Sequence, residues 1–122
     1  MRIRVLSVFV LVALLAVVAV VPASATEAHT CSHDMNTIES LHHCVNHALE
    51  MGHITNAGVA NALLAKLNGA QAALDRGQPA VAVNKLNAFI NQVQAQSGVH
   101  IDPMHAEHMI MHAQMVVAAL TS

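Results

Sequence analysis

Four stretches of this chain repeat apolar residues at helical spacing, and residues that start or stop helices separate them. The expected helix starts carry N-cap or first-turn residues: the capping-box-like Asn36-Thr37-Ile38-Glu39, then Thr55 or Asn56, then Pro79, and finally Asp102-Pro103. The first three expected ends carry glycine: Gly52, Gly77 and Ser97-Gly98. No segment shows a strand period bounded by hairpin turns.

Each expected helix has one apolar stripe that would face a common core. These stripes are Ile38, Leu41, Val45, Ala48 and Leu49; Ala60, Leu63, Leu67, Ala70 and Leu74; Val83, Leu86, Phe89, Ile90 and Val93; and Ala106, Met109, Ile110, Ala113, Val117 and Leu120. Four amphipathic helices with short connections predict a small antiparallel bundle in up-down-up-down order. The predicted fold class is therefore all-α, with a bundle domain over residues 36–122.

Residues 1–25 have the pattern of a cleaved secretory signal peptide. Arg2 and Arg4 form its basic start, Val5–Val21 its apolar region, and Pro22-Ala23-Ser24-Ala25 its cleavage site. An uncleaved membrane anchor is the alternative, although 17 apolar residues are at the short edge of a spanning helix. Residues 26–35 form a polar N-terminal segment. We therefore expect an extracytoplasmic protein, secreted or periplasmic, with no stable membrane anchoring after cleavage.

The charge of the remaining chain disfavours several partner classes. Residues 26–122 hold three Lys/Arg and seven Asp/Glu residues, a net charge of −4 with neutral histidines, which argues against nucleic acids and anionic membranes. Phe89 is the one aromatic residue left, so stacking platforms for sugars or single strands are not expected. The sequence also lacks nucleophile-elbow, Cys-x-x-Cys and phosphate-loop motifs, and we expect no enzyme.

Two cysteines, Cys31 and Cys44, follow the predicted cleavage site. Outside the cytoplasm an even pair of cysteines favours a disulfide. Two free thiols acting as metal ligands are the alternative.

The main candidate chemistry is a group of histidines and methionines on the first and last expected helices. His43 and His47 are one helical turn apart, as are His108 and His112, and His105 precedes them by three residues. Met104, Met111 and Met115 fall on the side of the last helix expected to be exposed. Antiparallel alignment with residue 51 opposite residue 103 would bring His47 near His108 and His43 near His112. The sequence thus predicts a four-nitrogen metal site across these helices.

Imidazole ligands suit Cu(II), Zn(II) or Ni(II), and thioethers suit Cu(I), so copper is the first expectation and zinc the second. Two other interpretations stay open for the histidines: a solvated face without function, and proton sensing between pH 7 and 5. His42 and His53 are expected to be edge or turn residues. The exposed methionines also fit a contact with a protein partner or a second copy, giving a weak homo-oligomer. The main rival is thus a non-catalytic structural or protein-interaction module with no metal role.

The stretch from Leu41 through Leu120 resembles the FIMAH domain, a small helical module of secreted bacterial proteins. The segments that carry the resemblance are Gly52-His53-Ile54-Thr55-Asn56-Ala57-Gly58-Val59-Ala60-Asn61, Leu63-Leu64-Ala65-Lys66-Leu67, Leu86-Asn87-Ala88-Phe89-Ile90-Asn91-Gln92-Val93 and Ser97-Gly98-Val99-His100-Ile101. The resemblance implies an all-helical extracytoplasmic module and brings no catalytic residues with it. The histidines, methionines and cysteines of the outer helices depart from the family pattern, and the family does not explain them.

Overall fold

The computed structural model describes residues 36–122, which form an antiparallel four-helix bundle, as the sequence predicts. The helices are α1 (Ile38–Glu50), α2 (Ala57–Asp75), α3 (Pro79–Gln96) and α4 (Pro103–Thr121). Each helix packs against the next in the chain, and α4 returns to pack against α1. The predicted signal peptide (1–25), the polar segment (26–35) and Cys31 lie outside the described residues.

The starts of α1 and α2 are capped by side chains that accept hydrogen bonds from backbone N–H groups of the first turn. Thr37 caps α1 by accepting from the Ser40 N–H, at 3.2 Å, and Asn56 caps α2 by accepting from the Val59 N–H, at 3.1 Å. The capping box predicted to begin at Asn36 is therefore displaced by one residue. Pro79 and Pro103 occupy first-turn positions, as predicted.

A glycine lies two residues past the end of each of the first three helices, where the backbone takes a left-handed conformation. Gly52, Gly77 and Gly98 have φ angles of 78°, 69° and 74°. A side chain would meet nothing within 4 Å at these positions, so only the backbone conformation requires glycine there.

The core agrees with three of the predicted stripes and differs most on α4. Buried helical residues that the stripes did not include are Ser40, Cys44, Ala73, Ala82, His105, His112 and Val116. Predicted core residues that are only partly buried are Leu49, Leu74, Val83, Ile110, Val117 and Leu120. The buried face of α4 is shifted toward α1. His105 and His112, which the sequence pattern placed outside the core, are therefore buried.

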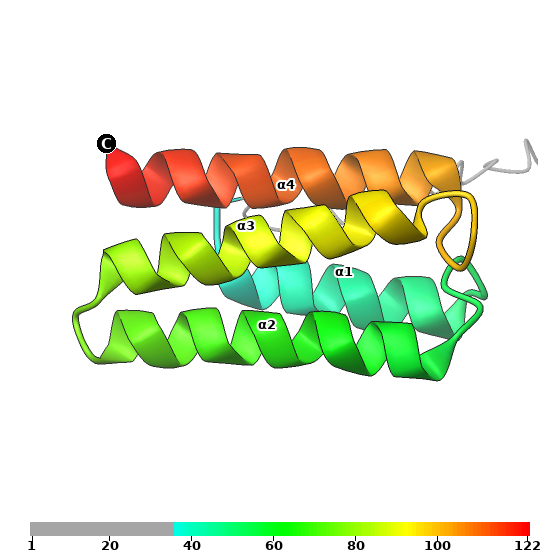
Figure 1. Ribbon diagram of the computed structural model, residues 1–122, viewed down its shortest axis with the longest axis horizontal. Helices are drawn as coiled ribbons and strands as arrows, with labels where there is room; N and C mark the ends of the chain where they lie inside the picture. The colour runs from blue at the N-terminus through cyan, green and yellow to red at the C-terminus, as the bar shows by residue number, and fades with distance from the viewer. Residues whose placement is uncertain (1–35) are drawn as a thin grey trace, which may run out of the picture.

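The α1–α2 and α3–α4 connections lie together at one end of the bundle (Figure 1). Ile54 and Ile101 form an isolated antiparallel bridge, and both side chains are buried. The Thr55 N–H donates to the His100 carbonyl at 2.9 Å, and the Asp102 N–H donates to the His53 carbonyl at 2.8 Å. This backbone pairing fixes the end of α1 against the start of α4.

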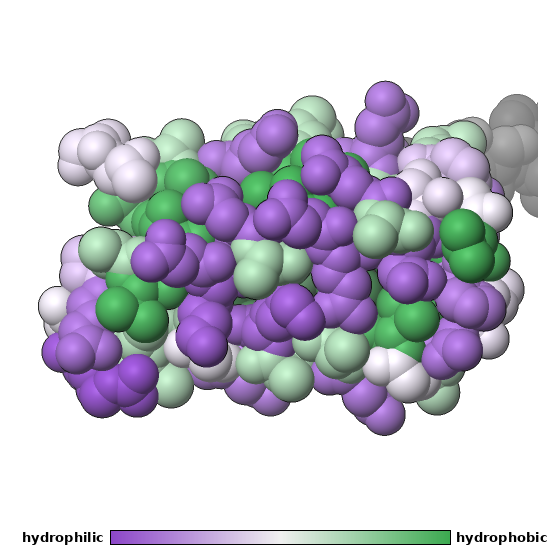
Figure 2. Space-filling model, viewed as in Figure 1, coloured by the Kyte–Doolittle hydropathy of each residue, from purple (hydrophilic) through white to green (hydrophobic). Residues whose placement is uncertain are grey.

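The face viewed in Figure 2 is mostly hydrophilic, with smaller hydrophobic areas scattered across it. In the part of the chain that the structure describes, no helix combines the length and hydropathy needed to cross a bilayer.

Candidate functional site

His112 lies inside the bundle, between α4 and α1. Its side chain is only 2% exposed, its Nε2 lies 2.7 Å from the Ser40 hydroxyl oxygen, and its Nδ1 lies 3.6 Å from the Cys44 sulfur. Contact with residues 40 and 44 places residue 112 level with residue 42, which is the antiparallel alignment predicted from the sequence. The facing side chains, however, are Ser40 and Cys44 rather than His43.

Burial lowers the pKa of His112 from its ordinary value of 6.5, because the charged imidazolium loses hydration inside the bundle. A neutral imidazole has one donor and one acceptor nitrogen, so it can satisfy both of its contacts. His112 is therefore a neutral polar group that joins two helices.

His105 is also buried, at 8% exposure, and it lies in the first turn of α4, beside the paired connections. Its ring stacks on that of His53, with centroids 3.6 Å apart and planes 15° apart. Its Nδ1 lies 3.1 Å from an Asp102 carboxylate oxygen, and this hydrogen bond is the main reason that the pKa of Asp102 is lowered. Asp102 also caps α4 by accepting from the Met104 N–H at 3.0 Å. His105 and His53 thus help to hold the two connections together.

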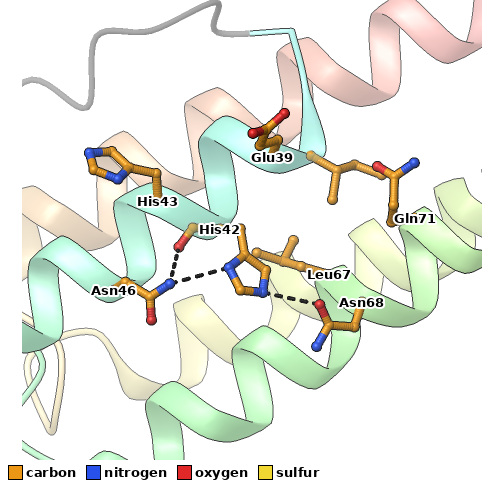
Figure 3. A pocket seen from close by; sticks show the side chains of 8 residues that line it. Glu39, His42, His43, Asn46, Leu67, Asn68 and Gln71 are labelled. Carbon is orange, nitrogen blue, oxygen red and sulfur yellow. Dashed lines mark hydrogen bonds between the residues drawn. The ribbon is translucent and has the colours of Figure 1, made fainter.

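His43 and His47 form a pair on the outer side of α1. His43 is exposed and His47 half-buried, and their ring centroids are 6.1 Å apart. His43 points away from His42, which turns toward α2 (Figure 3). The one-turn spacing therefore brings these two imidazoles to one side of the helix, as the sequence predicts.

The exposed side of α4 carries the three methionines predicted as thioether ligands. Met104, Met111 and Met115 are 63%, 47% and 38% exposed. His108 is half-buried, and the helical period places it in the same row as the three methionines. The prediction that these methionines are exposed is confirmed.

The predicted four-nitrogen cluster is not assembled in residues 36–122. No group of three or more His, Cys, Asp or Glu side chains is positioned there to hold a metal ion. The physical reason is that His105 and His112 turn inward and bind Asp102, Ser40 and Cys44, whereas the sequence pattern placed them outside. His43, His47 and His108 are the predicted histidine ligands that retain access to solvent.

Ser40 and Cys44 were not predicted from the sequence as contacts of His112. Their one-turn spacing on α1 is the signal that would have indicated them. Cys44 is buried, and its predicted partner Cys31 lies outside the described residues, so their disulfide stays a prediction. A polar groove between α1 and α2 was not predicted either; in it His42 lies between Asn46 and Asn68 (Figure 3).

Comparison with known protein families matches residues 38–118 to the FIMAH domain. No curated protein and no solved structure matches the chain. The matched range begins at the first residue of α1, includes all of α1, α2 and α3, and ends within α4. The chain therefore belongs to the FIMAH domain family.

Proposed function

We propose that this domain is an extracytoplasmic, non-catalytic binding module that captures a transition-metal ion, copper or zinc, at the edge where α1 and α4 meet. The observation that carries the proposal is the His43–His47 pair, whose ring centroids are 6.1 Å apart on one side of α1. Both imidazoles are at least partly accessible to an ion from solvent. Imidazole is a good ligand for copper and zinc in their divalent states.

The separation of the two rings suits a shared ion. Metal–nitrogen distances of about 2 Å place the ring centroids of two adjacent histidine ligands roughly 4.5–5 Å apart, about 1 Å closer than the observed 6.1 Å. A small change of side-chain rotamer would therefore bring His43 and His47 onto one ion without moving the backbone. Because exposed side chains exchange rotamers readily, the absence of a fully formed cluster is compatible with capture of an ion.

The α4 row supplies further ligands at the same height along the bundle. Residue 112 lies level with residue 42, so the antiparallel arrangement places His108 level with residue 46, between His43 and His47. The same alignment places Met111 level with His43. His108 is the proposed third ligand for a divalent ion, and Met104, Met111 and Met115 are proposed to favour Cu(I). His105 and His112 have structural roles and are left out of this ligand set.

The location and the disulfide belong to the same proposal. Residues 1–25 have the signal-peptide pattern, which would deliver the domain to the periplasm or outside the cell. In that oxidising environment Cys31 and Cys44 would be joined. A bridge to Cys44 would attach the histidine-containing segment 26–35 to α1, because Cys31 belongs to that segment and Cys44 belongs to α1.

Calorimetric titration of the purified, tag-free chain with Cu(II) and Zn(II) tests this function. We expect about one ion per chain, with affinity reduced at least tenfold in His47→Ala. His42→Ala is the matched control, since it removes one imidazole from the same helix on the side facing α2. Equal affinity in His47→Ala and the unmodified chain would overturn the proposal.

A second candidate function is a protein-interaction module with no metal role. The exposed row Met104, Met111 and Met115 favours it, because flexible thioether side chains form adaptable apolar contacts. Sedimentation measurements distinguish the two candidates. Metal-independent association that Met111→Lys abolishes would support the interaction module, and a monomer at every concentration would count against self-association.

A further inference from the structure

The three exposed methionines of α4 lie in one row along the helix, called here the methionine row. At about 100° per residue, Met104, Met111 and Met115 fall within roughly 40° of one another around the helix axis. Met115 lies one turn beyond Met111, a rise of about 6 Å. Their exposures are 63%, 47% and 38%, so solvent reaches all three side chains.

Met109 lies on the same helix and has the opposite environment. Its side chain is only 2% exposed, and it belongs to the hydrophobic core cluster. Within residues 36–122, that cluster and the partly buried side chains packed on it include no member of the methionine row. Met51, which follows the last residue of α1, is also exposed, at 52%, but it is not part of the row. An oxidant in solvent therefore reaches the row and Met51, whereas the fold protects Met109.

An exposed thioether reacts with hydrogen peroxide to give methionine sulfoxide. The sulfur lone pair forms an S–O bond while the O–O bond of the peroxide breaks, and the departing oxygen leaves as water. The sulfur loses two electrons, which the peroxide gains. Methionine sulfoxide reductases reverse the change. The side chain then presents a polar, hard oxygen in place of a soft sulfur ligand, and Cu(I) prefers the soft ligand.

We propose that the methionine row is a site of reversible oxidation by peroxide, and that its oxidation stops the capture of Cu(I) by this domain. The proposal rests on the proposed function, in which the row supplies thioether ligands to Cu(I). Peroxide converts these thioethers to sulfoxides but leaves the imidazoles of His43 and His47 in place. Oxidation therefore removes the binding of Cu(I) and preserves the binding of Zn(II).

The position of the row outside the core allows this modification without unfolding. A sulfoxide inside a packed core is disruptive, because it places a polar group among apolar side chains. Met109 is the methionine for which this would happen, and it is the one that the bundle covers. The row can gain oxygen atoms in contact with water, so oxidation changes the surface of α4 while the packing beneath it stays intact.

The test treats the purified, tag-free chain with hydrogen peroxide and identifies the oxidised methionines by peptide mass mapping. We expect each methionine of the row to gain one oxygen at least tenfold faster than Met109. Competition with a chromophoric Cu(I) chelator should show at least a tenfold loss of Cu(I) affinity, and calorimetry should show Zn(II) affinity unchanged within twofold. Methionine sulfoxide reductases of both stereospecificities should restore the Cu(I) affinity.

Met51→Leu is the matched control, because it removes an exposed thioether that lies outside the row. This variant should keep both the Cu(I) affinity and its loss on oxidation. The double variant Met111→Leu/Met115→Leu should bind Cu(I) more weakly before oxidation and lose less affinity afterwards.

Three results would overturn the proposal and leave the proposed metal function standing. These are oxidation of Met109 as fast as that of the row, an unchanged Cu(I) affinity after full oxidation of the row, and an equal loss of Zn(II) affinity. A chain that binds Zn(II) but not Cu(I) before oxidation would also overturn it, together with the role of the methionines as ligands. A chain that binds neither ion before oxidation would contradict the metal function itself.

Discussion

His112 illustrates how a polar residue becomes part of a helical core. Its imidazole fills space between α1 and α4, and both nitrogens lie within reach of polar partners, Ser40 and Cys44. Buried polar groups are tolerated when their hydrogen bonds are made within the fold. His43 is only one residue from Cys44, yet it lies at the surface. The role of each histidine therefore depends on the side of the helix that it occupies.

For this residue we predict that lowering the pH reduces the free energy of unfolding, because the buried His112 resists protonation. The pKa of His112 is lowered in the folded state, so the unfolded chain binds a proton more readily. Its contribution to stability is complete above the unfolded value of about 6.5 and is lost as the pH falls below it, with a limiting slope of about 1.4 kcal/mol per pH unit. Urea unfolding at pH 7.5 and pH 5.5 measures the change.

His112→Gln is the control for that measurement, because glutamine keeps hydrogen-bonding groups but does not titrate. We expect the variant to show a smaller loss of stability between the two pH values. The Asp102 carboxylate does not interfere, since its lowered pKa places its own effect below pH 3.8. Equal unfolding midpoints of the unmodified chain at pH 7.5 and 5.5 would contradict this account of His112.

Gly69 and Gly77 differ in backbone conformation: Gly69 is helical, and Gly77, just past the end of α2, is left-handed. Gly69 lies within the helix, where a methyl group would make ordinary contact with the Lys85 side chain at 3.5 Å. Gly77 follows the helix with a φ of 69°, a conformation that other residues adopt at a cost. Their replacement by alanine should therefore have effects of opposite sign.

We predict that Gly69→Ala raises the free energy of unfolding by about 0.5–1 kcal/mol, because alanine is the better helix former. Gly77→Ala should lower it by roughly 1 kcal/mol, because the left-handed conformation becomes strained. Chemical denaturation of both variants checks the pair. A loss of stability in Gly69→Ala equal to that in Gly77→Ala would show that conformation alone does not govern these sites.

The element boundaries are predictable from local chemistry, whereas the face of α4 is not. Pro79, Pro103 and the three helix-ending glycines act on their own backbone, so their effect can be recognised in the sequence. The hydropathy pattern of α4 instead favours Ile110, Val117 and Leu120 as core, and these are only partly buried. The buried face turns toward α1 because Ser40 and Cys44 offer space and hydrogen bonds to His112. Those partners belong to another helix, which the pattern of α4 alone does not reveal.

The candidate site also has features that one helix alone predicts and features that depend on contacts with another helix. The one-turn spacing of His43 and His47 was sufficient to predict their pairing, because both belong to one helix. The exposure of Met104, Met111 and Met115 was also predictable from α4 itself. The loss of His105 and His112 from the predicted ligand set depends on contacts with Asp102, Ser40 and Cys44, two of which are on α1.

In the whole molecule, α1 and α4 are the two helices farthest apart in the chain, and they pack together to close the bundle. An ion bound by His43 and His47 with help from His108 would join them. Since the unfolded chain does not hold these ligands together, binding should stabilise the folded state. The gain in stability on metal binding, compared with that of a variant lacking His108, shows whether both helices supply ligands.

We predict that Zn(II) at about 100 times its dissociation constant stabilises the unmodified chain by roughly 2.7 kcal/mol. At the same metal concentration His108→Ala should lose at least half of the increase in melting temperature. Gln114→Ala, a change at an exposed position on α4, is the control and should keep the full increase. An unchanged increase in His108→Ala would confine the site to α1.

The most direct test of the proposed metal site is a ring-nitrogen NMR spectrum of the purified chain before and after one equivalent of Zn(II). The account predicts that the imidazole nitrogens of His43 and His47 shift together, while those of His105 and His112 keep their positions. No shift at His43 and His47, or shifts confined to the buried histidines, would contradict the assignment of metal capture to the edge between α1 and α4.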